Sequence, residues 1–143
     1  MRIYIDTSFL ISLYSADSNS KTAAALMTES ADEHVISTFG ELEAINALQL
    51  RVFRKEISPQ QAKASRDDLA KDLRSGVVRL VALPDLAFKR AQALSEKTTA
   101  RLGTRTADLL HVAAALETEA DCLYSFDQQQ RRLARAVRLT INP

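Results

Sequence analysis

The alternation of short apolar runs with longer helical stretches is the feature that most constrains the fold of this chain. Short runs that are apolar on both faces predict strands covered by helices on both sides. Strands that alternate with helices predict an α/β fold with a mainly parallel sheet. The expected strands are 2–6, 34–37, 77–82, 121–126 and 137–141, and the expected helices are 8–15, 19–30, 39–55, 59–74, 85–98, 106–119 and 128–136.

The length of 143 residues suits a single domain with one hydrophobic core, spanning 1–143. The formal net charge is +1, so the overall charge neither demands nor excludes a nucleic-acid partner. The single cysteine, Cys122, cannot form an internal disulfide, which favours a reducing compartment. No signal peptide or membrane-spanning run is recognisable, so we expect a cytoplasmic protein without membrane contact.

Two aspartates stand where an expected strand is followed by an expected helix. Asp6 follows "RIYI" and Asp127 follows "CLYSF". Aspartate is among the best N-cap residues, so each residue alone is explained more simply as a helix cap. In parallel α/β sheets, ligands bind beyond the carboxyl ends of the strands. Each aspartate is therefore a candidate for a cap and for a ligand site.

Glu43 lies on the expected helix 39–55, at the edge of its predicted apolar side. At about 100° per residue, that side consists of Phe39, Leu42, Ile45, Leu50 and Phe53. Glu41 is rotated by roughly 160° from Glu43 and falls toward the outer side. A carboxylate that faces a core needs a partner. The partner of Glu43 is either an arginine at the rim of the core or a metal ion.

Asp108 lies in the first turn of the expected helix 106–119, where the helix dipole favours a negative charge. Val112 and Ala115 share its face, which indicates that Asp108 points inward. Thr104 or Thr106 is better placed to cap this helix. Asp108 is therefore predicted to face the interior without being needed as a cap.

These carboxylates form a chemically unusual group if they meet. Like charges in a low-dielectric site repel, and they stay ionised together only with cations between them. Hard oxygen ligands select Mg²⁺ or Mn²⁺, and such sites usually keep waters and bind substrate phosphates. The candidate metal ligands and catalytic residues for metal-assisted phosphodiester hydrolysis are Asp6, Glu43, Asp108 and Asp127.

Four segments, in order, resemble the motifs of the PIN-domain nucleases, and within them the VapC-type toxins of bacterial and archaeal toxin–antitoxin pairs. The segments are "YIDTSFLI", "STFGELEAINALQLR", "RTADLLHVAAAL" and "DCLYSFDQQQRRLA". The register of the second segment selects Glu43 over Glu41, in agreement with the helix-face argument. No single motif is specific, but four in order along almost the whole chain are.

This resemblance implies a three-layer α/β/α sandwich with a central, mainly parallel sheet of about five strands. It implies an Mg²⁺- or Mn²⁺-dependent endoribonuclease whose four acids hold the metal and position the attacking water, with Ser8 and Ser125 in supporting contacts. It also implies an RNA substrate, a cognate antitoxin and a homodimer. Some members carry a further acid where this chain has Gln128, Gln129 and Gln130, which leaves one or two metals open.

Basic side chains near these motifs could neutralise RNA phosphates, although solvated helix faces explain them more simply. The candidates are Arg105, Arg131 and Arg132, and the end of the Glu43 helix adds Arg51, Arg54 and Lys55. Among the remaining polar residues, His111 is predicted to be a packing residue with one hydrogen bond. His34 is predicted to be exposed, and Thr7 to have a purely structural part.

Three other functions remain open at this point. The same fold could serve as a nuclease in RNA maturation, or as a catalytically silent binding module, although the presence of all four acids argues against the silent module. A phosphohydrolase with an aspartate nucleophile would usually carry a second aspartate two residues after the first. This chain has Ser8 there, so the nuclease remains the leading hypothesis.

Overall fold

The computed structural model describes residues 1–143, and its five strands form one parallel sheet in the order β3-β2-β1-β4-β5. The strands are β1 (Arg2–Ile5), β2 (Glu33–Ser37), β3 (Arg79–Val81), β4 (Cys122–Tyr124) and β5 (Thr140–Asn142). The helices are α1 (Thr7–Tyr14), α2 (Ser20–Glu29), α3 (Thr38–Phe53), α4 (Pro59–Ser75), α5 (Asp85–Leu102), α6 (Thr106–Glu117) and α7 (Gln128–Ala136).

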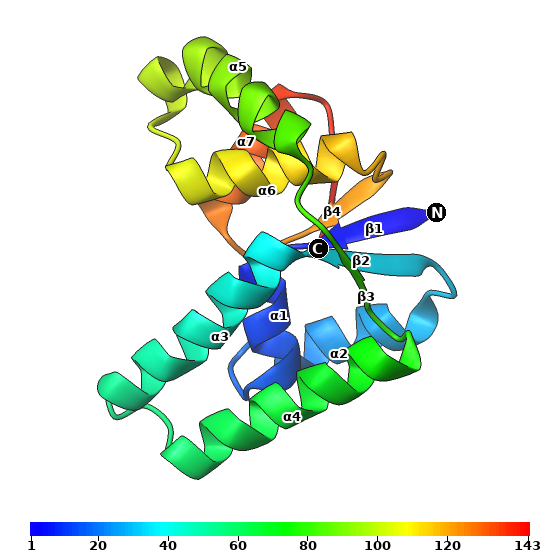
Figure 1. Ribbon diagram of the computed structural model, residues 1–143, viewed down its shortest axis with the longest axis vertical. Helices are drawn as coiled ribbons and strands as arrows, with labels where there is room; N and C mark the ends of the chain where they lie inside the picture. The colour runs from blue at the N-terminus through cyan, green and yellow to red at the C-terminus, as the bar shows by residue number, and fades with distance from the viewer.

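Helices cover both faces of the sheet, which confirms the predicted α/β/α sandwich. Helices α5, α6 and α7 lie on one side, and α1 to α4 lie on the other (Figure 1). Alternate residues of β1 serve the two cores, as the pleat of a strand requires. Tyr4 packs in the core with α5, α6 and α7, whereas Ile3 and Ile5 pack in the core with α1 and α2.

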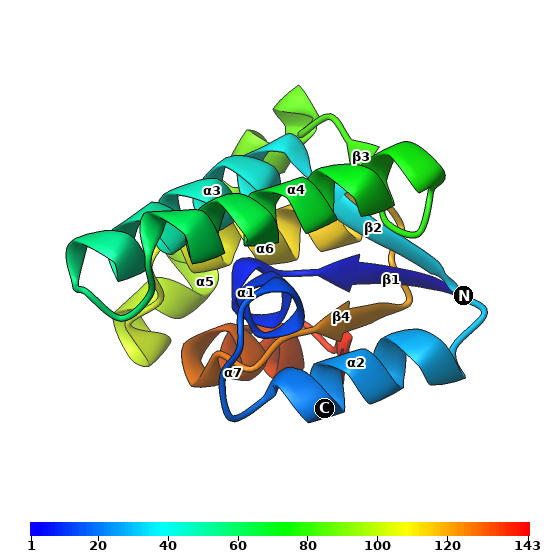
Figure 2. The ribbon, with the colours of Figure 1, turned by 90° about the horizontal axis from the view of Figure 1, so that it is seen from below.

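The strand order reverses between β1 and β4, because β2 and β3 lie on one side of β1 while β4 and β5 lie on the other. Figure 2 shows β1 and β4 side by side, with α1 directly following β1. A crevice forms outside the carboxyl ends of parallel strands at such a reversal. The residues that follow Ile5 and Tyr124 are therefore brought to one place by the topology.

Local sequence signals predicted several helix ends correctly. Ser58 accepts a hydrogen bond from the amide of Gln61, and the Gln61 side chain accepts one from the amide of Ser58, as the predicted capping box requires. Gly76 ends α4 with a φ of 80°, in the left-handed region. The strand expected over 77–82 is shorter, Arg79–Val81, and α5 continues beyond the expected residue 98 to Leu102.

The predicted apolar side of the helix that carries Glu43 is wrong. The buried residues of α3 are Gly40, Ala44 and Leu48, whereas Leu42 is 65% and Phe53 is 83% exposed. Small residues face inward because α3 packs against α1 and α4 as well as the sheet. Leu48 is the large apolar residue of α3 that is fully buried, whereas Leu42, Leu50 and Phe53 are left at the surface of this chain.

His34 is also not exposed as predicted. It is buried on β2, with its ring centroid 6.0 Å from that of Tyr124. Burial lowers the pKa of His34. As a separate finding, none of the helices combines the length and the apolar character that crossing a membrane requires.

Candidate active site

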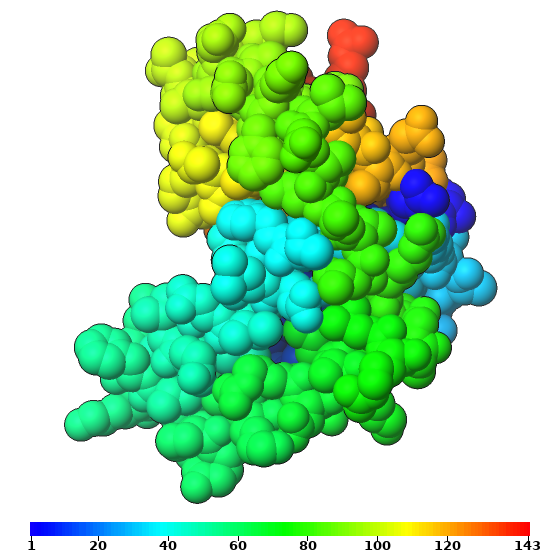
Figure 3. All heavy atoms as spheres, viewed as in Figure 1, coloured from blue at the N-terminus to red at the C-terminus, as the bar shows by residue number.

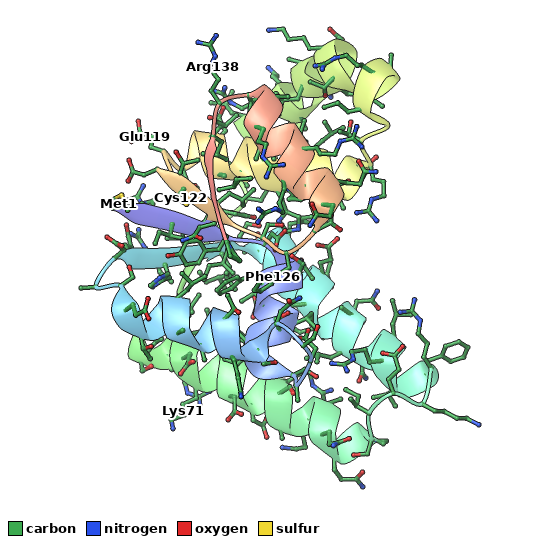
Figure 4. The ribbon with its side chains drawn as sticks, turned by 180° about the vertical axis from the view of Figure 1, so that it is seen from behind. Met1, Lys71, Glu119, Cys122, Phe126 and Arg138 are labelled. Carbon is green, nitrogen blue, oxygen red and sulfur yellow. The ribbon has the colours of Figure 1, made fainter.

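A cleft of about 690 Å³ opens at the carboxyl ends of β1 and β4. Its lining includes all four predicted acids, Asp6, Glu43, Asp108 and Asp127. Figure 3 shows the surface hollowed between α3 and the layer that contains α6. In Figure 4, Phe126, which also lines the cleft, lies at the junction of the two helical layers.

Asp6 follows β1 and caps α1, so its predicted structural role is real. Its Oδ1 atom accepts hydrogen bonds from the Phe9 amide at 3.0 Å and from the Ser8 hydroxyl at 2.7 Å. Asp6 is only 2% exposed, and no cationic side chain forms an ion pair with it. Burial raises the pKa of Asp6, and the charge interaction with His111 and the hydrogen bonds to its carboxylate only partly oppose this rise. This carboxylate therefore lies inside the protein without an ion-pair partner.

Asp127 follows β4 and caps α7, with Oδ1 accepting from the Gln130 amide at 2.9 Å. The two capped ends are joined by Ser8, whose hydroxyl donates to Asp6 and accepts from the amides of Phe126 and Asp127 at 2.9 and 3.2 Å. Ser125 also accepts from the Asp127 amide, at 3.1 Å. Both predicted supporting serines thus contact the residues at the reversal point of the sheet.

Asp108 is the third residue of α6 and, contrary to prediction, takes part in capping that helix. Neither Thr104 nor Thr106 is the N-cap; Arg105 occupies that position. An arginine side chain cannot accept hydrogen bonds, so Arg105 cannot cap the first amides of α6 with its side chain. Of the two hydrogen bonds in a capping box, only the one from the N-cap amide to the side chain of the third helical residue is present. The Asp108 carboxylate accepts from the Arg105 amide at 3.2 Å.

Arg105 is the cation between two of the predicted acids. Its guanidinium donates to Asp108 Oδ2 at 3.1 Å and Oδ1 at 3.2 Å, and to Asp127 Oδ2 at 3.1 Å. Of the other predicted phosphate contacts, Arg131 donates to the Ser125 carbonyl at 3.1 Å, and neither Arg131 nor Arg132 lines the cleft. On this side of the cleft the negative charges already have a cationic partner.

Arg54 is the second arginine that lines the cleft. It follows α3 directly and forms no ion pair or hydrogen bond through its side chain. Glu43, Ala47 and Arg54 share one side of the helix, since four and eleven residues correspond to about one and three turns. This stripe, and not the predicted apolar side, places Glu43 in the cleft.

Glu43 is held by hydrogen-bond donors from two other helices. Its Oε1 atom accepts from the Thr7 hydroxyl and from His111 Nε2, the latter at 2.6 Å. Burial alone would raise the pKa of Glu43, but the hydrogen bonds from His111 and Thr7 outweigh it and lower the pKa. Thr7 therefore contacts a predicted metal ligand, which the sequence interpretation missed.

His111 is buried as predicted, but it has more than one hydrogen-bonding partner. Besides Glu43 it contacts the Tyr4 hydroxyl at 3.1 Å and the Thr7 hydroxyl at 3.2 Å. A sequence signal existed, because His111 stands three residues after Asp108 and so shares its helix face. That face lines the cleft.

The donor set fits a hydrated divalent cation. No group of three or more His, Cys, Asp or Glu side chains is arranged to hold a metal ion in this conformation. Mg²⁺ is usually bound through one or two carboxylates and keeps several waters, so it does not require such a cage. The buried Asp6 carboxylate, which forms no ion pair, is the group that most needs a cation.

Gln128, Gln129 and Gln130 add no carboxylate to the cleft. Gln130 is 1% exposed, and its side-chain amide donates to the Asp108 carbonyl at 3.1 Å. This contact ties the start of α7 to α6. The segment therefore contributes alignment of the two helices and no further carboxylate.

Comparisons with known proteins agree with this geometry. The family model described as "PIN domain" matches residues 3–136. Among solved structures, the chain is similar to the Mycobacterium tuberculosis VapC20, a sarcin–ricin loop cleaving toxin, with a TM-score of 0.71 and 20% identity over 91% of this chain and 93% of the other. A comparison with curated protein sequences finds no match.

Two further structures have similar folds. VapBC2 from Rickettsia felis, bound to a DNA fragment from its promoter, has a TM-score of 0.69 and 15% identity over 99% of this chain and 98% of the other. VapBC-1 from nontypeable Haemophilus influenzae has a TM-score of 0.66 and 17% identity over 99% and 97%. Likeness at these identities concerns the fold.

Proposed function

The chain belongs to the PIN domain family, and from that premise we propose that it is an Mg²⁺- or Mn²⁺-dependent endoribonuclease. The observation that carries the proposal is the buried Asp6 carboxylate, which faces a cleft shared with three further acids and forms no ion pair. A protein that retains such a group loses stability unless a ligand compensates for the buried charge. A divalent cation with its waters provides that compensation.

In the proposed site, Asp6, Glu43, Asp108 and Asp127 hold the cation directly or through its waters. The bound cation supplies Lewis-acid stabilisation of the phosphate and lowers the pKa of a coordinated water. Ser8 keeps the ends of β1 and β4 together through its bonds to Asp6 and to the Phe126 and Asp127 amides. Ser125 supports the same turn.

The proposed reaction is hydrolysis of an RNA phosphodiester. The oxygen of a water forms the new bond to phosphorus while the bond to the leaving ribose oxygen breaks, and the leaving oxygen takes up a proton. Asp127 is suited to accept the proton of the attacking water, because its side chain is 33% exposed and faces the cleft. Arg54 and Arg105 provide positive charge for the RNA phosphates.

The matched variants Glu43→Gln and Glu41→Gln test this proposal. Both remove one carboxylate from α3, but only Glu43 lines the cleft. We expect purified protein to cleave RNA with Mg²⁺ or Mn²⁺ and to be inactive with EDTA. Cleavage should fall about 100-fold or more in Glu43→Gln, and it should be retained in Glu41→Gln. Equal cleavage by the two variants would refute the assignment of Glu43.

We further propose that the physiological role is that of a toxin with a cognate antitoxin, acting as a homodimer. Two of the similar structures are VapBC assemblies. In addition, α3 exposes apolar side chains, including Leu42 and Phe53, that a protein partner would cover. Expression of the wild type should arrest growth, whereas Glu43→Gln should not. An RNA-maturation nuclease would instead be tolerated and would alter specific precursors.

A further inference from the structure

A chain of buried polar contacts runs from Glu43 through α6 to the start of α3. His111 Nε2 lies 2.6 Å from Glu43 Oε1, and Nδ1 lies 3.1 Å from the Tyr4 hydroxyl. That hydroxyl lies 2.8 Å from Ser37 Oγ, which caps α3 by accepting from the Gly40 amide at 3.0 Å. His111, which is 3% exposed, thus connects Glu43 to the cap of the helix that carries it.

The chemistry of the partners decides which imidazole nitrogen carries the hydrogen. A carboxylate can only accept, so Nε2 of His111 must be the donor to Glu43. In the neutral ring Nδ1 is then an acceptor, and the Tyr4 hydroxyl donates to it. Ser37 in turn donates to Tyr4, so each donor in the chain has one acceptor. The neutral Nδ1–H tautomer would instead place two lone pairs, those of Nε2 and the carboxylate, against each other.

We infer that His111 is a positioning residue, which as the Nε2–H tautomer fixes the carboxylate of Glu43 for metal binding. Together with the Thr7 hydroxyl it holds Oε1, and Oε2 has no hydrogen-bonding partner in the protein. Oε2 is therefore the oxygen left for a divalent cation. This inference rests on the proposed function, because it takes Glu43 as a metal ligand. Hydrogen bonds to ligating groups orient them, and losing one typically costs 10- to 100-fold in metal affinity.

The tautomer can be measured directly by ¹⁵N NMR of the imidazole rings in the metal-free protein. The chain has two histidines, and His34→Gln removes the other signal. We expect hydrogen on Nε2 of His111 and an Nδ1 shift typical of an acceptor. Hydrogen on Nδ1 would overturn the inference. This measurement does not depend on whether the protein binds a metal.

Two polar substitutions separate positioning from packing. In His111→Gln the amide can reach Glu43, whereas in His111→Asn it can reach Tyr4 only. Titration calorimetry with Mn²⁺ should show affinity reduced by about 10- to 100-fold in His111→Asn and largely kept in His111→Gln. Val112→Ala, a buried neighbour on α6 that packs in the core, should lower the unfolding temperature without changing Mn²⁺ affinity.

The outcomes distinguish the inference from the proposed function. Wild-type affinity in a folded His111→Asn variant would overturn the positioning role of His111. If the wild type itself binds no Mn²⁺, the proposed metal site fails, and the tautomer measurement still tests the hydrogen bond to Glu43. Equal losses in His111→Asn and Val112→Ala would mean that His111 is a packing residue.

Discussion

The two sides of the cleft hold their carboxylates by different means. On the α6/α7 side, one guanidinium from Arg105 bonds to both Asp108 and Asp127. On the α1/α3 side, Asp6 and Glu43 are bound only by hydroxyls, one backbone amide and an imidazole. On the first side the carboxylates form ion pairs with an arginine of the chain, whereas on the second side neither carboxylate forms an ion pair with an arginine or a lysine.

This difference indicates where an external cation is needed most. Ionised groups without a counter-charge are costly to bury, and Asp6 is the most buried of the four acids at 2% exposure. We therefore expect the cation to bind first on the α1/α3 side. In the proposed mechanism, the α6/α7 side would become available when Arg105 exchanges a carboxylate for water or for a phosphate of the RNA.

The largest expected effect comes from Asp6→Asn, which removes the uncompensated charge while keeping an oxygen that can cap α1. Loss of a metal ligand should cost about 3 kcal/mol or more of transition-state stabilisation, hence about 100-fold or more in cleavage rate. Single-turnover RNA cleavage measures it, with Asp67→Asn on the exposed face of α4 as control. Undiminished cleavage by Asp6→Asn would remove the proposed difference between the two sides.

A smaller effect is expected from Arg105→Met, which removes the internal cation from the α6/α7 side. Charge-assisted hydrogen bonds to buried Asp108 are lost, but the Arg105 side chain is 63% exposed, so solvent replaces part of the interaction. The free energy of unfolding without metal should fall by about 1–2 kcal/mol. Arg132→Met should change it by less than about 0.5 kcal/mol. Chemical denaturation compares the variants, and equal stabilities would contradict the role given to Arg105.

The two acids of the α1/α3 side should respond to pH with opposite signs. Because burial raises the pKa of Asp6, its ionisation destabilises the fold as pH rises through that raised pKa. The free energy of unfolding of Asp6→Asn, relative to that of the metal-free wild type, should therefore increase as pH rises. The lowered pKa of Glu43 contributes stability above the unfolded pKa of about 4.3, and this is lost as pH falls through the folded pKa. Denaturation between about pH 2.5 and 8 covers the range in which each carboxyl titrates and tests both signs. Parallel curves for Asp6→Asn and Glu43→Gln would contradict them.

The smallest effect distinguishes the two arginines of the cleft as RNA contacts. Arg54 has no partner in the protein, whereas the charge of Arg105 is shared between Asp108 and Asp127. In an inactive Asp6→Asn background, Arg54→Ala should reduce the salt dependence of single-stranded RNA binding by about 0.7 in log–log slope. Arg105→Ala should reduce it less. A larger reduction for Arg105 would mean that the RNA already displaces its carboxylate partners.

Much of the fold follows from local signals. Short apolar runs, the capping box at Ser58 and the left-handed Gly76 place the bounds of the predicted elements within a few residues of the observed bounds. All twelve expected elements are present. The aspartates after β1 and β4 could also be placed in advance. Parallel strands bring their carboxyl ends together, so a strand-end residue is located by topology alone.

Contacts between distant helices could not be obtained in this way. Glu43 meets Thr7 and His111 across sequence separations of 36 and 68 residues. Periodicity describes only which side of a helix is apolar, and on α3 it indicated the wrong side, because Leu42 and Phe53 face solvent in this chain. The capping of α6 was missed for a similar reason, since a carboxylate at the third position can satisfy an N-terminal amide in place of an N-cap side chain.

The double use of Asp6, as a helix cap and as a cleft carboxylate, has an evolutionary consequence. Asparagine and serine cap helices nearly as well as aspartate, so a single substitution at position 6 can abolish the chemistry and leave the scaffold intact. Descendants of such a chain would keep their surfaces and their binding partners. They could then compete with active copies for the same partner, and a lineage could move from catalysis to regulation in one step.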